Sequence, residues 1–149
     1  MSKILSRALA AALLCAAVAA VPAAPPKRGA AANGASGDAS ALLAQPRFAK
    51  AWYTALGVDG REAWLAERDG PAPEPRWVRV AGNRYVLNAF CKPHDCFDHN
   101  AVLLYDPQQI SVYGLIHRPK RDTLVGTPPP ELAAALHRLW LGEWRQHLK

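Results

Sequence analysis

The spacing of apolar residues predicts helices in the first part of the folded region. Between residues 46 and 56 the apolar side chains recur at helical spacing, at Phe48, Trp52, Ala55 and Leu56. Pro46 suits the first turn of a helix and Gly57 suits its end, so a helix is expected over residues 46–56. A second, short helical turn is expected around Trp64 and Leu65. The Gly- and Pro-rich segment 70–75 then breaks regular structure.

After this break the apolar positions follow the alternation of strands. Strands are expected over residues 77–80, 85–90, 102–105 and 110–116, with a weak fifth strand at 123–125. Turn residues separate them at 81–83 and 106–109. A long C-terminal helix follows three prolines, with an apolar face of Leu132, Leu136, Leu139, Trp140 and Trp144. The pattern predicts an α+β domain, an antiparallel β-sheet of about four to five strands flanked by N- and C-terminal helices.

The N-terminal 40 residues lack this patterning. Residues 1–21 combine two basic residues with an uncharged apolar run and small residues, which predicts a signal peptide and export to the periplasm. The apolar run is too short to span a membrane, which takes about 20 residues. Residues 22–40 are rich in Ala, Pro and Gly and are expected to be a disordered tether, so the domain occupies residues 41–149. A lipoprotein anchored through Cys15 is the alternative, although Leu14 precedes it where a lipobox has a small residue.

Charge and motifs exclude two classes of function. The formal net charge of +6 becomes +4 when Lys3 and Arg7 leave with the signal peptide. Basic residues are interspersed with acidic ones, with one cluster at 117–121, whereas a nucleic-acid binder concentrates its positive charge in a stripe. The chain has no paired carboxylates on a candidate loop and no serine elbow. We therefore expect no nucleic-acid partner, no enzymatic activity and no cofactor.

The candidate chemistry lies in a six-residue segment between the second and third predicted strands, Cys91-Lys92-Pro93-His94-Asp95-Cys96. Its cysteines are the two that remain after export, and an isolated pair in an exported protein implies a disulfide. A loop this small gains only about 2 kcal/mol of stability from the bridge, so local rigidity explains it better. Pro93 removes further backbone freedom beside His94, and a rigid loop loses less entropy when it docks.

Three other interpretations of this segment stay open. The bridge could simply stabilise an exposed hairpin, with His94 an ordinary surface residue. Cys91, His94, Cys96 and His99 are residue types that bind zinc, as in a small periplasmic metal-binding protein, although only one residue separates His94 from Cys96. A redox-active pair is the third, but the spacing is not Cys-x-x-Cys and no βαβ pattern precedes it.

The same six residues resemble the signature loop of the Ivy family, periplasmic inhibitors of vertebrate (C-type) lysozyme. The similarity extends to the aromatic-bearing helix before the sheet, the apolar strand at 101–105 and the strand that contains Gly114. The C-terminal part matches more loosely, and the tether does not match. The resemblance implies an inhibitor with an antiparallel sheet flanked by helices.

The resemblance also implies how the loop acts. It would block the active-site cleft of lysozyme, with His94 as the key inhibitory residue between two catalytic carboxylates, where an imidazole can donate a hydrogen bond. Pro93 and the disulfide would shape the loop, and Lys92 and Asp95 would contact the walls of the cleft. Asp98 and His99 lie just past the ring and are candidates for its base.

The net positive charge bears on the choice of partner. C-type lysozymes are strongly basic, so long-range attraction would be weak or repulsive, which mainly slows association. This leaves a related muramidase as an alternative target, such as the lytic transglycosylases of the producing bacterium. A homodimer is a further expectation, because a sheet edge or helix face can pair with a second copy.

Overall fold

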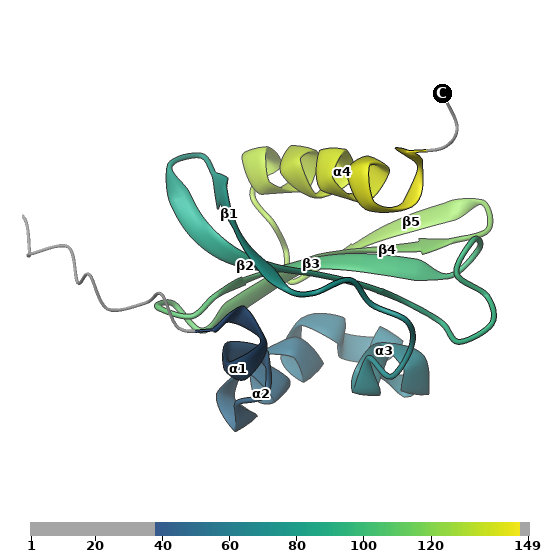
Figure 1. The fold of residues 1–149 in the computed structure, drawn as a ribbon, viewed down its shortest axis with the longest axis horizontal. Coiled ribbons are helices and arrows are strands. Elements are labelled where there is room, and N and C mark those ends of the chain that lie inside the picture. The colour runs from purple at the N-terminus through teal and green to yellow at the C-terminus, as the bar shows by residue number, and fades with distance from the viewer. Residues whose placement is uncertain (1–37, 147–149) are drawn as a thin grey trace, which may run out of the picture. The chain divides into compact units, whose positions relative to one another are not determined.

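The structure, a computed structural model, describes residues 38–146, which form an antiparallel sheet with helices on both faces (Figure 1). Its five strands lie in chain order: β1 (Arg76–Val80), β2 (Asn83–Cys91), β3 (Asn100–Asp106), β4 (Ser111–Arg118) and β5 (Arg121–Val125). Before the sheet come α1 (Ala39–Leu43), α2 (Pro46–Leu56), the 3-10 helix η1 (Gly57–Arg61) and α3 (Ala63–Glu67), and after it comes α4 (Pro130–Trp144). The predicted α+β meander flanked by helices is confirmed.

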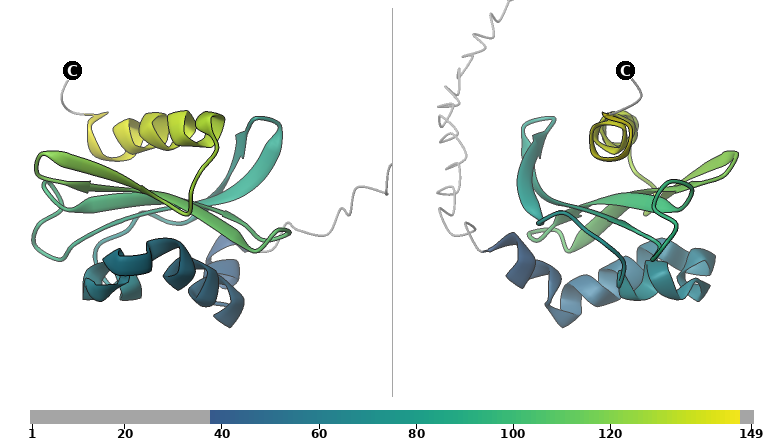
Figure 2. Two further views of the ribbon diagram at one scale, coloured as in Figure 1. Left: turned by 180° about the vertical axis from the view of Figure 1, so that it is seen from behind. Right: turned by 45° about the vertical axis from the view of Figure 1, so that its right-hand side comes forward.

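The central strands are buried on both faces. Every residue from Tyr85 to Cys91 in β2, and from Asn100 to Tyr105 in β3, is buried. Helices α1 to α3 cover one face and α4 covers the other, as both views of Figure 2 show. Successive side chains of a strand point to opposite faces, so the sheet contributes to two hydrophobic cores. This double cover explains why the central strands are apolar almost throughout.

Two short helices lie outside the sequence prediction. Helix α1 is five residues long, too short to display an apolar period, and the Asp38 carboxylate caps it by accepting a hydrogen bond from the Ser40 N–H at 3.0 Å. Because α1 begins at Ala39, the last residues of the expected tether are helical. The second is η1, which begins at Gly57, the residue with φ of +54° that ends α2 as predicted.

The predicted signal peptide (1–21) lies outside the described residues, and so does the predicted tether up to residue 37. Within residues 38–146, no helix combines the length and the apolar character needed to cross a bilayer.

Candidate functional site

The predicted disulfide is present and closes a small ring at the end of β2. Its sulfur atoms, in Cys91 and Cys96, are 2.01 Å apart, and the two Cα atoms are 4.8 Å apart. Cys91 is fully buried at the end of its strand, whereas Lys92 and His94 are exposed. His94 has φ of +62°, in the left-handed region that histidine adopts more readily than most side chains. The ring formed by residues 91–96, called the 91–96 ring below, therefore presents an imidazole to solvent.

The disulfide between Cys91 and Cys96 bears on the interpretation of this segment as a zinc site. Zinc binds thiolates, and a bridged pair supplies none. His99, the other proposed ligand, bonds through Nδ1 to Asp95. No group of three or more metal-ligating side chains occurs between residues 38 and 146. Of the four candidate ligands, Cys91 and Cys96 are bonded to each other and His99 is paired with Asp95, while His94 is exposed.

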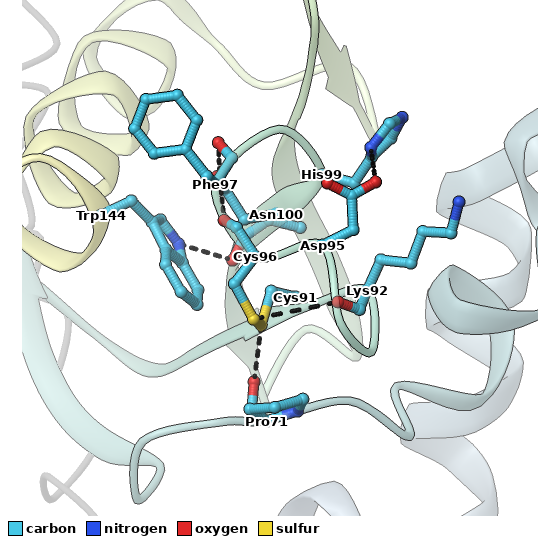
Figure 3. The surroundings of a disulfide bond; sticks show 10 residues. Pro71, Cys91, Lys92, Asp95, Cys96, Phe97, His99, Asn100 and Trp144 are labelled. Atoms are coloured by element: carbon cyan, nitrogen blue, oxygen red, sulfur yellow. Dashed lines mark hydrogen bonds and ion pairs between the residues drawn. A yellow bond between two sulfur atoms is a disulfide. The ribbon is translucent and has the colours of Figure 1, made fainter.

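Backbone and side-chain bonds brace the ring from within (Figure 3). The Lys92 N–H donates to the His99 carbonyl at 2.9 Å, and the Asp95 N–H donates to the Lys92 carbonyl at 3.0 Å. The Asp95 carboxylate lies 2.6 Å from His99 Nδ1, and the His99 N–H donates to the Asp95 carbonyl at 3.0 Å. Asp95, expected at a cleft wall, thus has a partner inside its own loop. His99 lies at the base of the ring, where the sequence placed it as a candidate, while Asp98 is exposed.

Helix α3 supports this base from one face of the sheet. The Trp64 ring packs edge-on against the His99 ring, with centroids 6.3 Å apart, and against Phe90 at 6.0 Å. The indole Nε1 of Trp64 donates to Glu62 at 2.8 Å. Glu62 in turn accepts from Arg118 of β4 at 2.5 Å. A continuous chain of contacts thus links the ring to β4 through α3.

Asn100 supports the ring from the other face and was missed by sequence reasoning. It is fully buried, and its Nδ2 donates to the carbonyls of Cys96 at 2.8 Å and Phe97 at 3.2 Å. Its Oδ1 accepts from Trp140 Nε1 of α4 at 2.6 Å. One amide therefore joins the backbone of the loop to the C-terminal helix. The signal available in the sequence was an asparagine at the start of an otherwise apolar strand.

The Gly- and Pro-rich segment 70–75 lies behind the disulfide. The Cys91 N–H donates to the Pro71 carbonyl at 3.2 Å. A Cβ placed on Gly70 would lie 1.6 Å from the Cys91 carbonyl oxygen, so only glycine fits this close backbone approach. The segment predicted to break regular structure also seats the first residue of the ring.

The Glu62 contacts give the fold a defined pH dependence. Burial raises the pKa of Glu62, but hydrogen bonds from Arg118 and Trp64 and the Arg118 charge outweigh it, so the pKa lies below its ordinary value of 4.5. A carboxyl with a lowered folded-state pKa contributes stability above its unfolded pKa and loses it as pH falls through the folded value. We expect the free energy of unfolding of the native chain to exceed that of Glu62→Gln above pH 4.5, with the difference shrinking below it.

Urea unfolding of both proteins across this pH range measures the difference. Glu67→Gln, which removes an exposed carboxylate at the other end of α3, is the control for the loss of one charge. A difference between the native chain and Glu62→Gln that stays constant down to acidic pH would contradict the assignment.

The arrangement of these residues suits binding rather than catalysis. His94 is exposed on a ring that is closed covalently and fixed at its base from both faces of the sheet. Such a group can enter a groove and exchange hydrogen bonds there with little loss of conformational entropy.

Comparison with known proteins shows a family to which most of this chain is similar. Residues 47–147 match the family model described as "Inhibitor of vertebrate lysozyme (Ivy)", a range that includes the 91–96 ring and all five strands. A Pseudomonas aeruginosa protein named "Inhibitor of vertebrate lysozyme" is 29% identical over 104 residues, which are 68% of this chain and 66% of that protein. The chain thus spans just under two thirds of the length of this relative.

Proposed function

The chain belongs to the family of inhibitors of vertebrate lysozyme (Ivy), a family of inhibitor proteins rather than enzymes, and from this premise we propose that it inhibits C-type lysozyme. The 91–96 ring would block the active-site cleft. The observation that supports this most directly is the exposed His94 on a disulfide-closed ring.

The chemistry of the cleft explains why an imidazole would bind there. A lysozyme cleft holds two carboxylates, one a proton donor and the other ionised. An imidazole between them can donate a hydrogen bond to the ionised oxygen, and a protonated imidazole can donate from both nitrogens. Pro93 and the disulfide would keep His94 in position. Lys92, which is exposed, would contact the wall of the cleft, and Asp95 would do so through the face of its carboxylate that His99 leaves open.

The same proposal places the protein in the periplasm. Residues 1–21 would direct export, and residues 22–38 would connect that signal to the domain as a tether. Disulfides form and persist in oxidising compartments such as the periplasm, and the ring depends on one. A cell that exports such an inhibitor would protect its peptidoglycan from lysozyme in the surroundings.

A turbidity assay on bacterial cell walls tests this proposal. We expect the native chain to slow clearing by C-type lysozyme. The Cys91→Ser/Cys96→Ser variant should inhibit about 10-fold more weakly, because its open loop must become ordered on binding. A 10-fold loss corresponds to an ordering cost of about 1.4 kcal/mol. Clearing at the uninhibited rate in the presence of excess native chain would refute the proposal.

Charge favours one second candidate. The processed chain would carry a net charge of +4, so its long-range electrostatic steering toward a strongly basic lysozyme would be weak or repulsive. Lytic transglycosylases of the producing bacterium are the alternative target. The same assay with C-type lysozyme, G-type lysozyme and a lytic transglycosylase separates the candidates by which enzyme is inhibited at the lowest concentration.

A further inference from the structure

Phe97 is an exposed aromatic residue directly after the ring. Its side chain is 68% exposed, although burying a phenylalanine is favourable. Single exposed apolar residues are common on protein surfaces, so exposure alone does not define a contact. What separates Phe97 from an ordinary exposed residue is how firmly its backbone and its ring are held.

Three bonds and contacts hold Phe97 in place. Its carbonyl accepts from Arg145 Nη2 at 3.0 Å and from Asn100 Nδ2 at 3.2 Å. The Arg145 guanidinium lies over the Phe97 ring at 4.9 Å, and over the Trp140 ring at 4.7 Å. Such cation–π contacts are attractive even at exposed sites. Phe97 is therefore fixed before any partner arrives, which reduces the entropy that it loses on binding.

Phe97 lies next to the 91–96 ring in the chain, so a partner that docks on the ring would come close to it. It follows Cys96 directly, and Figure 3 shows its ring directed toward the α4 side, away from the Asp95 and His99 pair. The Arg145 guanidinium contacts the rings of both Phe97 and Trp140. This side of the loop therefore presents an aromatic ring to solvent with a fixed cation beneath it.

A surface of this kind fits the edge of a ligand-binding cleft. Such clefts are lined mainly by hydrophobic and aromatic side chains. Aromatic anchors that are held rigidly contribute most of the affinity in many protein interfaces. Resting on the proposed function, we infer that Phe97 is a second anchor beside His94, one that packs against apolar side chains at the rim of the lysozyme cleft, and that Arg145 is the residue that positions it.

Inhibition constants of full-length variants test this inference. Phe97→Ala should raise the inhibition constant against C-type lysozyme about 10- to 100-fold, the range of an interface hot spot. Tyr53→Ala is the matched control, because Tyr53 is also an aromatic residue with 57% exposure, but it lies on α2 away from the ring. Its inhibition constant should stay within about 2-fold of the native value, as for residues outside an interface.

A double-mutant cycle separates the positioning role of Arg145 from a direct contact. Arg145→Ala should weaken inhibition several-fold in the native background and have no further effect in the Phe97→Ala background, because the residue would act through Phe97. If His94→Ala inhibits weakly but Phe97→Ala has the same inhibition constant as the native chain, the role of Phe97 is refuted and the proposed function is not. A native chain that does not inhibit lysozyme would overturn both this contact and the proposed function.

Discussion

Replacing His94 by alanine should raise the inhibition constant against C-type lysozyme by about 100-fold, equivalent to about 2.7 kcal/mol. The expected loss is large because the substitution would leave the carboxylates of the enzyme buried under the loop without a hydrogen-bond donor, and such losses typically cost 2–5 kcal/mol. Loss of the His94 side chain should remove few contacts, because it is exposed, so any change in thermal unfolding should come from the backbone at this position. Inhibition assays and melting curves on the same samples measure both effects.

The backbone at this position calls for a second variant. His94 has φ of +62°, and alanine is less favourable there than histidine. His94→Gly removes the side chain without that backbone penalty. If both variants lose inhibition while His94→Asn, which tolerates this conformation and keeps a donor, retains part of it, the side chain is responsible. Full inhibition by His94→Gly would show that the imidazole is not the blocking group.

Asn100→Ala should lower the free energy of unfolding by about 3 kcal/mol, the largest loss of stability expected from a single polar substitution near the ring. The variant leaves the Cys96 carbonyl and the indole N–H of Trp140 without their Asn100 partner, and the Phe97 carbonyl keeps only its bond from Arg145. Urea unfolding measures the change. Weaker inhibition by the folded variant is also expected, because the loop loses its bond to α4.

Gln109→Ala is the control, because Gln109 carries an exposed side-chain amide in the turn between β3 and β4. Its free energy of unfolding should change by no more than about 0.5 kcal/mol, as is usual for surface substitutions. An Asn100→Ala variant as stable as this control would mean that water replaces the missing amide.

The long elements were predictable because each repeats its apolar pattern often enough to be read. Helix α2 has the predicted bounds of Pro46–Leu56, and α4 and the five strands lie where the period indicated. Helix α1 and η1 have five residues each; α1 packs against α2 and β1, and η1 packs against α2 and α3. Ile110, expected to open the fourth strand, lies before β4 with φ of +53°. A strand boundary set by turn geometry leaves little trace in an apolar pattern.

The ring was predictable from its cysteines, but its supports were not. Asn100 and Trp140 are 40 residues apart in sequence, and Gly70 meets Cys91 from a segment that looked like a plain linker. Contacts of this kind follow from the tertiary fold and have no local signal. Asp95 and His99 differ, because a spacing of four residues already allows such a pair on one helical turn. That spacing was the available reason to expect Asp95 to act within the loop.

The fixed 4.8 Å between the Cα atoms of Cys91 and Cys96 also bears on how long the molecule survives among proteases. Six residues pulled straight would span about 17 Å, at roughly 3.3–3.6 Å for each step. Exposed loop tips are preferred sites of proteolytic cleavage, and cleavage requires the segment to extend through the protease. A segment whose ends are tied together cannot extend in this way. Pro93, which follows the basic Lys92, restricts the backbone there further. The ring that carries the exposed His94 is therefore also a segment that we expect to resist digestion.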